Sequence, residues 1–341
     1  MTGPLDLLLR ECRLPDGLVM DIGCRDGRIV AIGRLARRSA ARAISCEGRA
    51  VTPGLVDAHI HLDKALLTER TPSREGSLAE ALRVTGEAKR GFTRDDIEAR
   101  ARRVLDMAVR QGTTAMRSHA EVDPIVGLMG FEALAALKRE YAPAIDLQLC
   151  AFAQEGILQA RGTEALLREA LRAGADLVGG VPYNDTDARR HIDIVFDLAA
   201  EFSVDVDFHT DFFDEPQHLH ARYIAEQTMR RGWQGRVAVG HMCEMAALPP
   251  DEQASLARRL AEAGVAVIVL PATDLYLMGR KDLRSVRRGL APVRRLLEAG
   301  VTVAAAKTAA NRAAINLVIW GPCVMMVDDE TALTECAGHG E

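Results

Sequence analysis

A single local pattern recurs along this chain of 341 residues: an amphipathic helical run, then a glycine, then a short run rich in β-branched residues. The glycines concerned are Gly112, Gly174, Gly264 and Gly300. Glycine ends a helix at little cost because it readily adopts the left-handed cap conformation. A continuous apolar run after it is typical of a strand buried on both faces. Four further runs read as strands, namely 54–62, 146–152, 204–211 and 236–242. The chain therefore predicts eight buried strands.

The alternation of strands and helices predicts the fold class. Amphipathic helical patterns at 97–108, 163–173 and 253–263 lie between expected strands. Alternation of this kind, repeated about eight times, is typical of a closed parallel (β/α)8 TIM barrel. A doubly wound open sheet is the alternative, but no G-x-G-x-x-G motif follows any of the strands.

The first 50 residues follow another pattern. Short alternating runs are separated there by turn signals such as Pro15-Asp16-Gly17 and Asp26-Gly27. They predict a small N-terminal antiparallel β lobe. We expect three parts, a β lobe at 1–52, the barrel at 53–306 and an atypical tail at 307–341.

Composition excludes several classes of partner. The net charge of −5 and the aromatic content of 4% give no footprint for nucleic acid or an anionic membrane. The longest apolar stretch, 313–327, is interrupted by Asn316, Gly321 and Pro322 and is too short for a membrane span. The seven cysteines show no repeated spacing, which fits a reducing cytoplasm. We expect a cytoplasmic protein with a small-molecule partner, and a homo-oligomer stays open because barrels often pair.

Polar side chains gather where the expected strands end, which is where barrels of this type carry their chemistry. They are His59, His61, Asp63, Lys64, Arg117, His119, Glu121, Gln154, Glu155, Tyr183, Asn184, Asp185, His209, Asp211, His241, Thr273, Asp274 and Lys307. His59 and His61 alternate on one strand and so face the same side. A third ligand would let this pair hold a divalent metal, and His209 is the obvious candidate. Arg117 and His119 either contact substrate or form salt bridges at the barrel rim.

Five segments resemble, in order, the cytosine-deaminase-like branch of the amidohydrolase superfamily. They are PGLVDAHIHLDKALL (53–67), AFAQEGI (151–157), DFHTDFFDEPQ (207–217), VGHM (239–242) and LPATDLYLMGR (270–280). The resemblance runs from about residue 5 to about residue 300, and the motifs are specific in combination.

The resemblance implies a site and a reaction. His59, His61 and His209 would bind one divalent metal, zinc or iron. His241 would steady the attacking hydroxide or the developing oxyanion. Gln154 would read a cyclic amide or amidine, and Asp274 would line the pocket. The implied reaction is hydrolysis of a C–N bond in a nitrogen heterocycle, with release of ammonia or an amine.

This chain departs from the family pattern at two places. Phe212 stands where cytosine deaminase has a proton-shuttling glutamate; Asp211, its neighbour, is our candidate catalytic carboxylate, and Asp214 and Glu215 follow. The eighth strand leads to Lys307 where the family has a metal-binding aspartate. No Asp or Glu occurs between Glu298 and Asp328, and the closing segments of the small lobe are missing or diverged.

Three hypotheses follow. The first is a metal-dependent amidohydrolase acting on a nitrogen heterocycle. The second is a catalytically impaired relative that binds a small heterocycle or a partner without turnover, because an ammonium group at Lys307 would repel a divalent ion. The third is metal-free chemistry through a Schiff base on Lys307. It does not explain why three histidines are placed where they could bind a metal.

Overall fold

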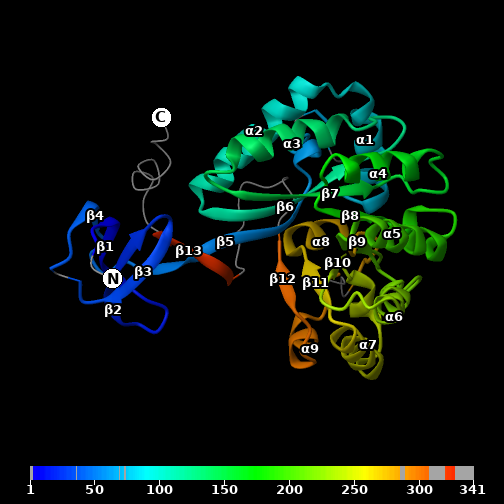
Figure 1. The fold of residues 1–341 in the computed structure, drawn as a ribbon. Helices are drawn as coiled ribbons and strands as arrows, with labels where there is room; N and C mark the ends of the chain where they lie inside the picture. Colours follow the sequence, from blue (N-terminus) through cyan, green and yellow to red (C-terminus); the bar gives the residue numbers. More distant parts are fainter. Residues whose placement is uncertain are drawn as a thin grey trace. The chain divides into compact units, whose positions relative to one another are not determined.

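The computed structural model describes residues 3–35, 37–68, 70–72, 74–284, 289–306 and 319–326. Lys307, on which part of the sequence prediction depends, lies outside them. The chain divides into two compact units. One contains β1–β4, the start of β5, the link from α2 to β6, and β13; the other contains the remaining strands and helices (Figure 1). The chain passes from one to the other within β5, between Val56 and Asp57.

The small unit is built on a four-stranded sheet of order β3-β2-β1-β4. Its strands are β1 (Leu5–Arg13), β2 (Val19–Arg25), β3 (Arg28–Gly33) and β4 (Ala40–Ser45). The β1–β2 and β2–β3 pairs are antiparallel, as predicted, whereas β4 runs parallel to β1. A buried cluster that includes Leu9, Ile22 and Val51 forms the core of this unit.

Eight consecutive strands form the predicted barrel sheet. They are β5 (Val51–Ile60), β6 (Thr113–Glu121), β7 (Asp146–Ala153), β8 (Leu177–Gly180), β9 (Asp205–Thr210), β10 (Val237–His241), β11 (Val265–Val269) and β12 (Val303–Ala305). Neighbours in sequence are neighbours in the sheet, and β7 to β12 pair in parallel. Ala58 of β5 packs against a cluster that contains Ile268 and Ala306. The first and last barrel strands are therefore brought together, and the prediction of a (β/α)8 TIM barrel is confirmed.

The helices lie outside the strands (Figure 1). They are α1 (Leu78–Ala88), α2 (Arg94–Arg110), α3 (Met129–Tyr141), α4 (Thr163–Arg172), α5 (Ala188–Phe202), α6 (Ala221–Arg231), α7 (Pro250–Glu262), α8 (Pro271–Leu277) and α9 (Val293–Glu298). Residues of α2, α4 and α7 carry the three helical patterns read from the sequence. Gly112 and Gly174, which follow α2 and α4, have φ of 89° and 99°, which is why glycine ends these helices.

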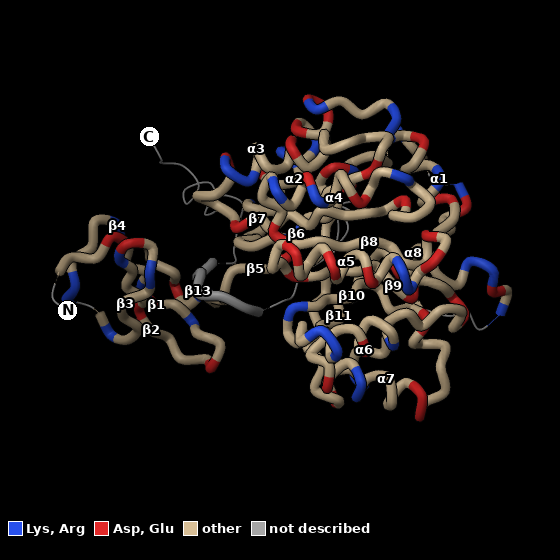
Figure 2. The backbone as a smooth tube through the Cα atoms, turned by 45° about the vertical axis from the view of Figure 1, so that its right-hand side comes forward, with Lys and Arg blue, Asp and Glu red and all other residues tan. Residues whose placement is uncertain are grey.

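Charges of both signs are interspersed along the helices (Figure 2). The Arg168 Nε, for example, lies 3.0 Å from the Glu201 Oε2. Such exposed pairs contribute little stability each. No helix in the described ranges is long and apolar enough to cross a membrane. The cytoplasmic location and the homo-oligomer stay predictions.

Two elements differ from the expected ones. The strand expected after Gly264 ends at Val269, and Pro271–Leu277, which continues the apolar run, is the helix α8. Proline suits the first turn of a helix because it needs no N–H partner there. A strand in the tail, β13 (Ile319–Met326), pairs antiparallel with β5 and was not predicted.

Candidate active site

Four imidazoles meet at one end of the barrel strands. His59 lies near the end of β5 and His61 directly after it, while His119 and His209 lie on β6 and β9. One nitrogen from each can be chosen so that all four lie within 4.8 Å of one another. The ring centroid of His59 is 4.3 Å from that of His209 and 4.4 Å from that of His119. The structure thus brings together the three predicted metal ligands and adds a fourth histidine.

Several nitrogens of this cluster are buried without a partner among the described residues. They are both ring nitrogens of His59, Nδ1 of His61, Nδ1 of His119 and Nε2 of His209. Leaving such a group unpaired costs about 1–3 kcal/mol. Burial lowers the pKa of His59, His61 and His209 well below the usual histidine range, and the neighbouring imidazoles lower each of them further. Neutral imidazoles with free lone pairs are the form that binds zinc or iron, so these residues fit a divalent metal.

A carboxylate backs the fourth histidine. Asp207 on β9 is fully buried, and its Oδ1 lies 3.2 Å from Nε2 of His119. The other oxygen accepts a hydrogen bond of 2.8 Å from Nη1 of Arg117. Burial alone would raise the pKa of Asp207, but His119 and Arg117 outweigh it and lower the pKa. Asp207 is therefore an anion next to the imidazole cluster.

His241 is held on two sides. Its Nδ1 lies 3.0 Å from Oδ1 of Asp274, a fully buried carboxylate on α8. Asp274 in turn accepts a hydrogen bond from the backbone N–H of Leu270. The Phe212 ring stacks on the His241 ring, with centroids 3.7 Å apart and planes 16° apart. Phe212 thus packs against the histidine predicted to steady the hydroxide or oxyanion.

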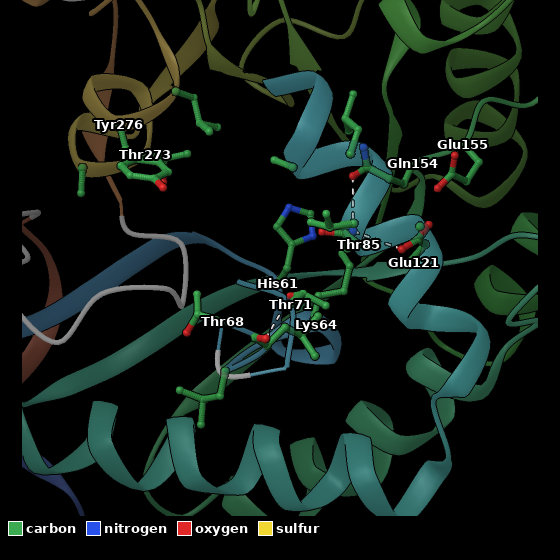
Figure 3. Close-up of a pocket in the computed structure, with 18 residues that line it drawn as sticks. His61, Lys64, Thr68, Thr71, Thr85, Glu121, Gln154, Glu155, Thr273 and Tyr276 are labelled. Atoms are coloured by element: carbon green, nitrogen blue, oxygen red, sulfur yellow. Dashed lines mark hydrogen bonds and ion pairs between the residues drawn. The ribbon is translucent and has the colours of Figure 1, made fainter. Parts of the chain in front are cut away.

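A cavity of about 440 Å³ adjoins the cluster through His61 (Figure 3). Its polar lining includes Gln154, the residue expected to read the substrate. Lys64 Nζ donates to Oε1 of Gln154 at 3.3 Å and lies 3.1 Å from Oε2 of Glu121. Apolar side chains complete the lining, and they are Leu66, Leu67, Ala81, Leu82, Val84, Ala272 and Leu277.

The helix α1 forms one wall of this cavity, and its start is fixed by side chains. The Ser77 side chain caps the helix by accepting from the N–H of Glu80. The Glu80 carboxylate accepts hydrogen bonds of 2.8 Å from the backbone N–H groups of Arg74, Glu75 and Gly76. A capping arrangement of this kind holds the preceding loop to the helix.

A buried ion cluster lies beside the cavity. Nζ of Lys89 donates to Glu121, Asp123 and Glu155 at 2.6, 2.6 and 2.7 Å, and Lys89 is 2% exposed. Burial would lower the pKa of Lys89, but the three carboxylates outweigh it and raise the pKa. These carboxylates are close enough together to hold a metal ion, yet the ammonium group already lies among them.

Asp211, the predicted catalytic carboxylate, caps a helix in this structure. It accepts hydrogen bonds from the Thr210 hydroxyl at 2.8 Å and from the backbone N–H groups of His220 and Ala221, where α6 begins. Burial and the nearby Glu244 raise the pKa of Asp211 to about 7. The hydrogen bonds that the structure records for Asp211 involve none of the four imidazoles.

The remaining predicted site residues support others rather than line the cavity. Arg117 binds Asp207 and also donates to Oε1 of Gln148. Neither it nor Asp274 is among the cavity-lining residues. The sequence predicts His119 only as a residue that contacts substrate or forms a salt bridge at the rim. Its one signal was its position at the end of a strand. Lys89 follows α1, away from any strand end, so the pattern of polar strand ends could not find it.

Comparison with known proteins gives consistent results. The profile of a family described as "Amidohydrolase family" matches residues 42–307. N-isopropylammelide isopropyl amidohydrolase of Pseudomonas sp. (strain ADP) is 31% identical over 263 residues, which are 74% of this chain and 64% of that protein. Pterin deaminase of Rhizobium rhizogenes is 28% identical over 309 residues, 89% of this chain and 69% of that one. The chain thus spans less than two thirds of the first of these relatives.

Comparison with solved structures finds the same kinds of protein. The 5-methylcytosine deaminase of Klebsiella pneumoniae, crystallised with 5-fluorocytosine, superposes with a TM-score of 0.83 at 32% identity. The alignment covers 88% of this chain and 74% of that chain. N-isopropylammelide isopropylaminohydrolase of Burkholderia multivorans gives a TM-score of 0.76 at 27% identity, over 89% and 74% of the two chains.

Proposed function

Because the chain belongs to the amidohydrolase family, we propose that it is a metal-dependent hydrolase that cleaves a C–N bond in a cyclic amide, a cyclic amidine or another nitrogen heterocycle. One observation carries the proposal. The cluster of buried, unpartnered imidazoles includes His61, which also lines the cavity that contains Gln154. A group able to bind metal and a group able to bind substrate therefore line the same cavity.

His59, His61 and His209 would hold the metal, zinc or iron. Their nitrogens are buried and neutral, and imidazole suits both metals. When bound, such an ion supplies a water nucleophile at neutral pH and polarises the group under attack.

His241 would hold and move a proton at Nε2. If Nδ1 donates to Asp274, the lone pair stays on Nε2, which can then accept a proton from the attacking water and stabilise the developing oxyanion once protonated. We propose Asp274 as the positioning residue that selects this tautomer, rather than as a substrate ligand. The stacked Phe212 fixes the plane of the same ring.

Gln154 would bind the substrate. Its Oε1 accepts from Lys64, which leaves the two N–H donors of the amide for a carbonyl or ring nitrogen of the heterocycle. We propose that Arg117 does not contact the substrate but positions Asp207, which in turn contacts His119. Asp211 would act by capping α6 and so positioning the segment after His209.

The test measures release of ammonia and of alkylamine by the purified full-length chain loaded with zinc or iron. The panel takes 5-methylcytosine, pterin and N-isopropylammelide, the compounds in the names of the relatives. We expect turnover of at least one compound, lost in His209→Asn and retained in His218→Asn, an exposed histidine outside the cluster. Metal-loaded protein that turns over no member, while binding one, would contradict the proposal.

That contradicting outcome is the second candidate function, a homologue that binds a heterocycle without turnover. It is favoured by the sequence between Glu298 and Asp328, which contains no Asp or Glu. Calorimetric titration with the panel distinguishes the two functions, because the second candidate requires binding heat and an unchanged ligand.

A further inference from the structure

We propose that His119 is a fourth imidazole ligand of the metal, so that β6 supplies the protein ligand for which the eighth strand has no carboxylate. This inference rests on the proposed function, since it concerns the metal held by His59, His61 and His209. It goes further because it assigns a ligand that the three-histidine site does not contain.

The first observation is proximity. A nitrogen of His119 lies within 4.8 Å of nitrogens of the other three histidines. Its ring centroid is 4.4, 5.2 and 4.7 Å from the centroids of His59, His61 and His209. The four rings therefore form one compact cluster in which His119 is as close as the other three.

The second observation is the state of the His119 nitrogens. His119 is fully buried, and Nδ1 has no hydrogen-bond partner in the described part of the chain. Nε2 lies 3.2 Å from a carboxylate oxygen of Asp207. The contact with Asp207 occupies Nε2 only, so Nδ1 stays available to a metal. A ligating histidine presents one nitrogen to the metal and the other to a carboxylate, a backbone carbonyl or water.

The third observation is charge. A divalent ion on neutral imidazoles alone would carry two uncompensated positive charges in a buried place. The Asp207 carboxylate, buried and held on its far side by Arg117, gives negative charge to the site through His119. An aspartate that binds the ion directly would compensate in the same way, and between Glu298 and Asp328 the sequence has none.

X-ray absorption on the zinc-loaded full-length chain tests this without any substitution. We expect four imidazole nitrogens and one water oxygen around the zinc, with the outer-shell scattering of four imidazole rings. The scattering of only three imidazole rings, with oxygen in the remaining positions, would overturn the inference and leave the proposed function standing. A chain that retains neither zinc nor iron would overturn both.

Variants give a second readout that does not depend on turnover. We expect His119→Asn to lower zinc affinity by at least about 100-fold in a competition titration, and Asp207→Asn by about 10–100-fold. His218→Asn, the matched control, keeps the affinity of the parent chain. Unchanged affinity in a folded His119→Asn, judged by circular dichroism, would overturn the inference, and the scattering measurement decides if that variant does not fold.

Discussion

At the scale of single residues, the imidazole cluster depends on the absence of a side chain at position 240. A Cβ placed on Gly240 of β10 would lie 3.3 and 3.4 Å from two atoms of the His59 ring and 3.6 Å from the His209 ring. Contacts of this length force a neighbour to move by tenths of an ångström. Both neighbours are candidate metal ligands, so the space above Gly240 is part of the site.

Gly240→Ala is therefore expected to weaken metal binding more than it weakens the fold. We expect zinc affinity to fall about tenfold, similar to the loss of an orienting contact around a metal ligand, as measured by competition titration. Gly91→Ala is the control, because a Cβ there meets no atom within 4 Å. Equal affinity in the two variants would show that the imidazoles have more room than the structure gives them.

At the scale of elements, burial at the start of α6 makes stability depend on pH. Burial lowers the pKa of His220 to about 4, and the nearby His218, His191 and Arg189 lower it further. The unfolded chain has the ordinary value near 6.5. Below that pH the unfolded state binds a proton that the folded state refuses, so this contribution is complete above pH 6.5 and is lost as the pH falls towards 4.

His220→Asn should flatten that slope. Between pH 7.5 and pH 4.5 we expect the parent chain to lose on the order of 1 kcal/mol more unfolding free energy than the variant, allowing for partial exposure of the ring. Urea unfolding at both pH values measures the difference.

The raised pKa of Asp211 acts in the opposite direction, since stability is lost as the pH rises from about 4 to about 7. Asp211→Asn should therefore change the slope with the other sign, and parallel slopes in all three chains would refute both assignments.

The elements themselves were largely predictable from the sequence. Apolar runs after Gly112 and Gly264 became strands because burial on both faces requires such runs. The sequence at Pro271 looked like the end of a strand, but its proline starts α8, which brings Asp274 to His241. The parallel pairing of β4 and the strand β13 were not predictable, because short alternating runs do not specify which partner they meet.

At the scale of the whole molecule, metal binding should stabilise the fold. Zinc that binds only the folded chain adds about 2.7 kcal/mol when free zinc is 100 times Kd. We expect a higher melting temperature in calorimetry on addition of zinc, and no increase in His59→Asn. An increase of the same size in both would place the ion elsewhere.

The part of the site that lies within one strand was predictable from the sequence, and the part that joins different strands was not. His59 and His61 alternate along one strand, and local geometry alone puts their rings on one side. The close approach of His119 depends on how β6 lies against β5 and β9, which the sequence of β6 does not specify. The same holds for Arg117 and Asp207, whose pairing joins two strands that are 90 positions apart.

The ammonium group of Lys89 determines where the counter-ion of three carboxylates comes from. Glu121, Asp123 and Glu155 need a cation, and the chain provides one that is covalently attached and cannot diffuse away. This ion cluster keeps the Lys89 ammonium group as its counter-ion even when a chelator removes every free metal ion. These three carboxylates therefore need no second metal ion to balance their charge.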